Sequence, residues 1–109
     1  MAGPKKDTSR QSREAAWTFL SNHGHVLVCI AQNPDVRIAE IADLVGIGER
    51  AAHRIVSDLV AGGYVVRTKD GRRNTYTVDF DMPLRHPLEA DHTIGEIFRV
   101  ITGMRRTRR

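Results

Sequence analysis

The spacing of apolar residues and glycines over residues 37–78 constrains the fold more than any other feature. Two short amphipathic helical patterns meet at a glycine-containing turn at 46–48. A glycine pair at 62–63 ends the second pattern, and two extended runs joined at 70–71 follow it. This order of helix, turn, helix and hairpin predicts a module of packed helices with a two-stranded β-ribbon beside them.

A further helix is predicted upstream of this module. Ser21 or Asn22 can cap its start. It should end at about Gln32, because the residue before Pro34 disfavours the helical region. Its apolar stripe consists of Val26, Leu27, Ile30 and Ala31. The preceding run, 15–20, fits both strand and helix spacing, so both assignments stay open.

The two helices of the module have recognisable ends. The first begins near Arg37 and ends at Gly46, since glycine accepts the left-handed conformation that follows a helix. The second occupies about 48–61. Its apolar face consists of Ala52, Ile55, Val56 and Leu59. Its polar face consists of Glu49, Arg50, His53, Arg54 and Ser57.

The Asp-Gly pair at 70–71 predicts a two-residue hairpin turn. A turn centred there pairs Val65 with Tyr76 and Arg67 with Asn74. Val65, Tyr76 and Val78 then share the face that covers the helices. The cations at the tip are Lys69, Arg72 and Arg73.

A last helix is predicted after a proline-containing connector. Thr93 and Glu96 form a capping box, and Gly103 ends the helix. The apolar stripe is Ile94, Ile97, Phe98 and Ile101. Residues 81–103 therefore either pack on the domain or form a dimer. We favour a homodimer, because the helix follows the hairpin and can extend off the domain.

Positive charge is unevenly distributed along the chain, whose net charge is +4. Residues 1–13, a predicted flexible arm, carry a net charge of +3, and the tail 104–109 carries +4. Residues 14–103 hold nine basic and twelve acidic residues, yet 47–76 alone has a net charge of +3. The turn, helix and hairpin thus attract a polyanion.

Residues 37–78 resemble a winged helix-turn-helix of the MarR-like or ArsR-like regulator type. The residues that carry this resemblance are Ile38, Ile41, Ala42, Val45, Gly46, Ile47, Arg54, Leu59, Gly63, Tyr64, Val65, Gly71, Arg72, Arg73, Asn74 and Tyr76. Gly48 and the alanines at 51–52 depart from the family pattern. The resemblance implies an α+β, mainly helical fold: a three-helix core with a β-hairpin wing over 14–80, and an extra C-terminal helix.

The resemblance also implies a sequence-specific transcription regulator of double-stranded DNA, with a recognition helix at about 48–61 in the major groove and a wing at 64–78. Arg50 and Arg54 lie four residues apart, so they share a helical face and can each bond a guanine edge. The predicted DNA-binding residues are Arg50, His53, Arg54, Glu49, Ser57, Arg67, Lys69, Arg72 and Arg73. The last two suit phosphates or a narrow minor groove.

Other functions find less support in the sequence. His23 and His25 are two apart and do not face each other on a helix, and Cys29 is the single cysteine. We therefore expect no metal, no cofactor and no catalysis. The alternatives are a winged-helix module that binds protein and an ArsR-like metal or redox sensor.

The sequence also predicts a cytoplasmic, nucleoid-associated protein without a membrane partner or a small-molecule substrate. The lone Cys29 fits a reducing compartment. No run approaches the roughly 20 apolar residues of a membrane span.

Overall fold

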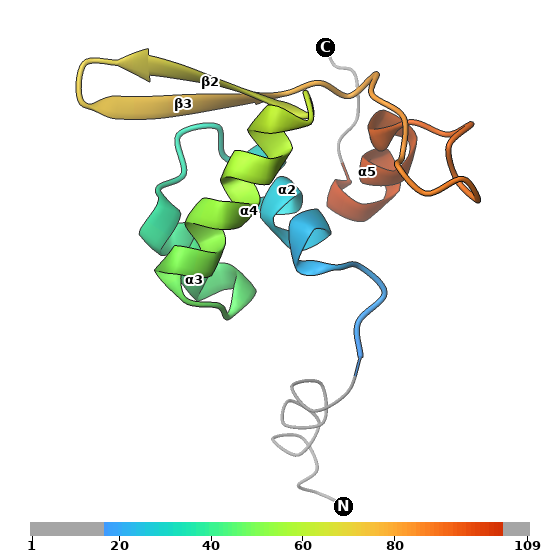
Figure 1. Ribbon diagram of the computed structural model, residues 1–109, viewed down its shortest axis with the longest axis horizontal. Helices are drawn as coiled ribbons and strands as arrows, with labels where there is room; N and C mark the ends of the chain where they lie inside the picture. The colour runs from blue at the N-terminus through green and yellow to red at the C-terminus, as the bar shows by residue number, and fades with distance from the viewer. Residues whose placement is uncertain (1–16, 104–109) are drawn as a thin grey trace, which may run out of the picture.

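A computed structural model of the chain describes residues 17–103. The elements in chain order are α2 (Asn22–Gln32), α3 (Ile38–Val45), α4 (Glu49–Ala61), β2 (Val65–Asp70), β3 (Arg73–Val78) and α5 (Ile94–Thr102). The two strands form one antiparallel ribbon that projects beyond the helices, and α5 lies on the other side of α2 and α4 (Figure 1).

Helix α2 begins and ends as its sequence predicts. The Ser21 side chain accepts a hydrogen bond from the backbone N–H of Gly24 at 3.3 Å, which caps the first turn. The helix ends at Gln32, and Asn33 is already extended. Residues 17–20 form neither helix nor strand, whereas 15–16 lie outside the described residues.

The turn between α3 and α4 depends on one glycine. Gly46 has φ of 85°, in the left-handed region, and the backbone N–H groups of Gly46 and Ile47 both donate to the carbonyl of Ala42. Ile47 packs against the core from this turn. Helix α4 then crosses α3 with Ala52 fully buried at 0 % exposure. A small residue there allows the close approach that a helix-turn-helix needs.

The hairpin register differs from the predicted one. Val65 pairs with Val78, Arg67 pairs with Tyr76, and the turn is centred on 71–72. Gly71 has φ of 67°, so the residue that tolerates positive φ takes the first central position of the turn. The shift moves each pairing by two residues and preserves the faces. Val65, Tyr76 and Val78 are consequently all buried, as expected.

One apolar core joins all the helices to the base of the ribbon. Its members from α2, α3 and α4 are Val26, Leu27, Ile30, Ile41, Ala42, Ala52, Ile55, Val56 and Leu59. The rest are Val36, Tyr64, Val65, Tyr76, Val78, Ile94 and Phe98. Because Ile94 and Phe98 belong to this cluster, α5 is attached to the winged domain.

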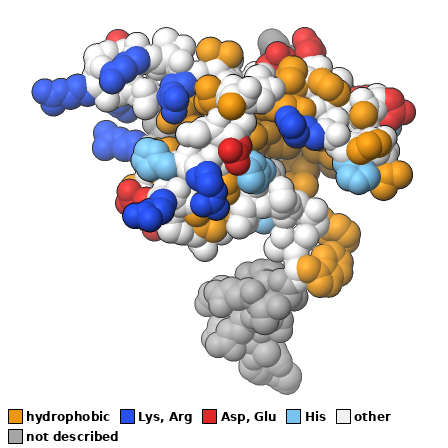
Figure 2. All heavy atoms as spheres, viewed as in Figure 1, with side chains coloured by type: hydrophobic (Ala, Val, Ile, Leu, Met, Phe, Trp, Pro, Cys, Tyr) orange, Lys and Arg blue, Asp and Glu red, His pale blue; other side chains and the backbone are white. Residues whose placement is uncertain are grey.

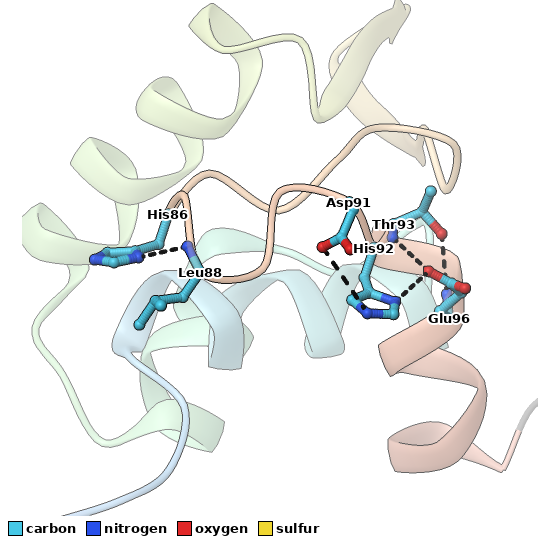
Figure 3. A network of polar contacts seen from close by, with 6 residues as sticks. All are labelled: His86, Leu88, Asp91, His92, Thr93 and Glu96. Atoms are coloured by element: carbon cyan, nitrogen blue, oxygen red, sulfur yellow. Dashed lines mark hydrogen bonds and ion pairs between the residues drawn. The ribbon is translucent and has the colours of Figure 1, made fainter.

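The connector between β3 and α5 is held by hydrogen bonds. The Tyr64 hydroxyl donates to the carbonyl of Pro83. Thr93 and Glu96 form the predicted capping box, and His92 lies between Asp91 and Glu96 (Figure 3). The backbone N–H of Thr93, and then His92, lower the pKa of the Glu96 carboxyl.

The element order and packing are those of a winged helix-turn-helix, an α+β and mainly helical fold with an extra C-terminal helix, as predicted. Across residues 17–103, no helix has the length and apolar character needed to cross a bilayer.

Candidate nucleic-acid interface

Helix α4 presents a polar face opposite its buried face. Ala52, Ile55, Val56 and Leu59 fix the helix in the core. All five polar residues predicted for the other side are exposed, namely Glu49, Arg50, His53, Arg54 and Ser57. The amphipathic period of the helix therefore aims these side chains at solvent.

The wing carries the second group of predicted residues. Arg67 and Lys69 share the ribbon face of Val65, nearer to the tip, whereas Arg73 lies on the opposite face and Arg72 in the turn. All four side chains are exposed. The ribbon thus offers positive charge on both faces and at its end.

Hydrogen bonds attach the wing to the loop between α2 and α3. The backbone N–H of Tyr76 donates to the carbonyl of Pro34 at 2.9 Å. The Thr75 hydroxyl donates to the Asp35 carboxylate at 3.4 Å. These contacts hold the ribbon against the helical core, so its position relative to α4 is defined.

The cations of α4 and the wing are free to bind an external anion. Between residues 17 and 103, the ion pairs that form are His23–Asp58, His92–Asp91 and His92–Glu96, and none involves an arginine or a lysine. Binding a phosphate there would break no ion pair among these residues. Figure 2 shows most of the Lys and Arg side chains of this face gathered over the wing and α4, although positive charge also lies over the half that contains α5.

The histidines are engaged in separate local contacts. His23 Nε2 lies 2.8 Å from Asp58 Oδ2, and His92 Nδ1 lies 3.2 Å from Glu96 Oε1. His86 Nδ1 accepts the backbone N–H of Leu88 (Figure 3). In the described part of the chain, no three His, Cys, Asp or Glu side chains are grouped to hold a metal ion. Burial raises the pKa of the Cys29 thiol, which disfavours the reactive thiolate.

A groove of about 980 Å³ was not anticipated from the sequence. It lies between the start of α2, the end of α4, the connector and α5. Its lining residues come from segments far apart in the chain, so no local pattern reveals it. The sequence offered one sign of this groove: the residues at 17 and 19 are aromatic, yet neither belongs to the apolar face of a predicted element.

Comparisons with known proteins identify the family of the chain. No curated protein matches the chain. Among solved structures, the zinc-dependent MarR family transcriptional regulator AdcR in its Zn(II)-bound state is 17% identical, with a TM-score of 0.45 over 97% of this chain and 88% of that one. The sequence profile of the MarR family matches residues 19–73, from the start of α2 into the wing. The chain therefore belongs to the MarR family and is a DNA-binding transcription regulator.

Proposed function

We propose that this regulator reads duplex DNA sequence-specifically with α4 in the major groove and the wing on the backbone or in the minor groove. The observation that carries the proposal is the set of exposed cations on α4 and the wing, which form no ion pair with any residue in 17–103. Such a set fits a polyanion whose grooves admit a helix.

Arg50 and Arg54 are the proposed base-reading residues. They stand one turn apart on the exposed face of α4. Each guanidinium can donate two parallel hydrogen bonds to O6 and N7 of a guanine, worth about 1–3 kcal/mol of discrimination against another base.

The other polar residues of α4 have supporting roles in this proposal. His53 and Ser57 can donate to a base edge or a phosphate. Glu49, in the first helical turn, either accepts from a cytosine amine or complements the positive end of the helix dipole. The Glu49 carboxylate repels DNA phosphates, so it restricts the positions that the start of α4 can take on the duplex.

The wing residues Arg67, Lys69, Arg72 and Arg73 are proposed to bind phosphates. Contacts of this kind position a protein on DNA and add affinity without reading sequence. Arginines at the tip also suit a narrow, A·T-rich minor groove, where the negative potential is enhanced.

The proposal is tested by selecting binding sites from random duplexes and then titrating selected and random duplexes by fluorescence anisotropy. Arg54→Ala should weaken binding to the selected site and relax the selected sequence. Arg72→Ala should weaken binding to both duplexes alike. Arg99→Ala, which removes the same charge from exposed α5, is the matched control and should change neither.

Two results would reject the assignment. One is unchanged affinity for both Arg54→Ala and Arg72→Ala. The other is the absence of salt-sensitive binding to random duplex at micromolar protein, which would instead favour a winged helix that binds protein. A regulator that binds the chromosome acts where the DNA is, so we further propose a cytoplasmic, nucleoid-associated location.

A further inference from the structure

The wing meets the helical core over a short stretch at the base of the ribbon. Within β2 and β3, both of which the structure describes in full, the buried residues are Val65, Tyr76 and Val78, and Thr75 is half-buried. Every strand position nearer to the turn is exposed. Among residues 17–103, the contacts at the base of the ribbon therefore determine where its tip lies.

The loop between α2 and α3 forms hydrogen bonds with two successive residues of β3. The backbone N–H of Tyr76 donates to the carbonyl of Pro34 at 2.9 Å, and the Thr75 hydroxyl donates to the Asp35 carboxylate at 3.4 Å. We call this pair of bonds the wing clamp. Figure 1 shows the loop rising from the helices toward the ribbon. The clamp thus gives an edge strand partners on its outer side.

The loop that makes the wing clamp is itself held to the helical core. The backbone N–H of Asn33 donates to two carbonyls at the end of α2, at 3.1 and 3.2 Å. The Asn33 side-chain oxygen accepts the backbone N–H of Asp35 at 3.1 Å, and Val36 is buried. The ring of Pro34 fixes one backbone torsion. Because α3 begins just after this loop, the clamp ties the wing to the helix pair that contains α4.

Most cations of the wing lie beyond the clamp. Arg67 pairs with Tyr76 across the ribbon, so this cation lies at the clamp itself. Lys69, Arg72 and Arg73 lie farther along, toward and in the turn. The ribbon extends beyond the clamp by about 10–13 Å at the rise of a strand. A tilt of about 15° at the clamp would therefore move the tip by roughly 3 Å, enough to break a charge-assisted hydrogen bond to a phosphate.

We propose that Asp35 and Thr75 are positioning residues, whose hydrogen bond sets where the tip of the wing lies relative to α4. The cations of the tip then reach phosphates while α4 reads bases. This inference rests on the proposed DNA function and deepens it, because neither residue has to touch DNA. The bond is directional, so it restrains the angle of the ribbon as well as its attachment.

The strength of one hydrogen bond limits the size of the effect. The backbone bond between Tyr76 and Pro34 does not depend on the side chain of Thr75, so the wing stays attached when that side chain is changed. The net contribution of one hydrogen bond corresponds to about a 2- to 12-fold change in an equilibrium constant. Loss of the Thr75 hydroxyl should accordingly weaken DNA binding by about two- to tenfold at low salt.

The test measures binding of the full chain to the selected duplex and to random duplex by fluorescence anisotropy. Thr75→Val replaces the hydroxyl with a methyl group. It should weaken binding to both duplexes alike and make the salt dependence shallower, because phosphate contacts of the tip are lost. Thr75→Ser keeps a hydroxyl and should restore wild-type binding. Thr77→Val makes the same change at an exposed position on the same face of β3 and should bind as the wild type does.

Two variants of Asp35 separate its hydrogen bond from its charge. Asp35→Asn keeps an acceptor oxygen and removes a negative charge that repels phosphates, so it should bind at least as tightly as the wild type. Asp35→Ala removes the acceptor as well and should bind about two- to tenfold more weakly than Asp35→Asn. This difference should disappear when Thr75→Val is also present, because the two residues then have no bond to lose.

A double-mutant cycle distinguishes positioning from a general effect on folding. In a chain that combines Lys69→Ala, Arg72→Ala and Arg73→Ala, the further change Thr75→Val should have little effect on affinity, because the contacts that it would misplace are already gone. A loss of folded protein would instead weaken binding by the same factor with or without the tip cations.

Three results would overturn the positioning role. One is wild-type affinity and salt dependence in Thr75→Val, the second is an equal loss in both backgrounds of the cycle, and the third is failure of Thr75→Ser to restore binding. If removal of the tip cations weakens binding while Thr75→Val does not, the positioning role alone is refuted. If removal of the tip cations leaves binding unchanged, the proposed wing contacts with DNA are refuted as well.

Discussion

The strongest quantitative prediction concerns salt and the wing tip. Replacing both Arg72 and Arg73 by Ala removes two exposed cations that pair with no group in the described part of the chain. Each phosphate contact contributes about 0.9 to the slope of log affinity against log salt. The double variant should therefore lower the magnitude of that slope by about 1.8 for each bound domain.

This change is large enough to measure by anisotropy. Between 50 and 200 mM salt, a slope of 1.8 corresponds to a roughly 12-fold change in affinity. The wild type should thus lose about 12 times more affinity for random duplex over this interval than the double variant does. The affinity of the variant should approach that of the wild type at high salt.

A matched double variant, Arg85→Ala with Arg99→Ala, removes the same charge from exposed positions on the connector and α5. Its slope should stay close to that of the wild type, because these residues lie outside the proposed interface. Equal slope changes in the two double variants would refute the reasoning. The attraction would then depend on total charge and not on the wing.

Three further predictions concern stability, measured by urea denaturation. Phe98→Ala, at a 2% exposed core position, should cost about 3–5 kcal/mol, whereas Val100→Ala, 81% exposed, should change stability by less than about 0.5 kcal/mol. Ala52→Leu should cost about 1–3 kcal/mol or more by overpacking the α3–α4 crossing, and retention of full stability would contradict that crossing. Because folding lowers the pKa of Glu96 from 4.5, this group contributes stability above about pH 4.5 that is lost as pH falls through the folded pKa. Glu96→Gln should make the acid loss shallower, and an unchanged acid limb would argue against the capping box.

Helix ends could be predicted because single residues encode them. The side-chain oxygens of Ser21 and Thr93 cap α2 and α5, and Gly46 takes the left-handed conformation after α3. Each of these effects operates within one helical turn. The few residues around each helix end are therefore enough to predict where that helix begins or ends.

The hairpin turn was predicted one residue too early, because Gly71 could take either central position of a two-residue turn. The buried face was nevertheless correct, since the displaced turn changes the pairing by an even number of residues. The choice between the two registers depends on how the ribbon packs on the helices, including the bond from Tyr76 to Pro34. Such contacts are not encoded locally.

The candidate DNA-binding residues of α4 were predicted to be exposed because helical periodicity separates them from the core, and those of the wing because they lie at or near the hairpin tip; all of them are exposed. Their contacts with DNA stay predictions. The groove between α2, α4, the connector and α5 could not be predicted, because it forms only when α5 packs against α2 and leaves a hollow next to α4. Packing of distant elements, not residue type, creates it.

Helix α4 is uninterrupted over thirteen residues, with neither proline nor glycine inside it. A straight helix of that length spans about 20 Å. Pivoting it by about 10° at its carboxyl end would carry its amino end through roughly 3 Å. Hydrogen bonds tolerate only a few tenths of an ångström in length, so such a pivot would move Arg50 and Arg54 out of the positions in which they are proposed to bond DNA bases. A contact that tilts the carboxyl end of α4 should therefore weaken the proposed reading of DNA bases at its amino end.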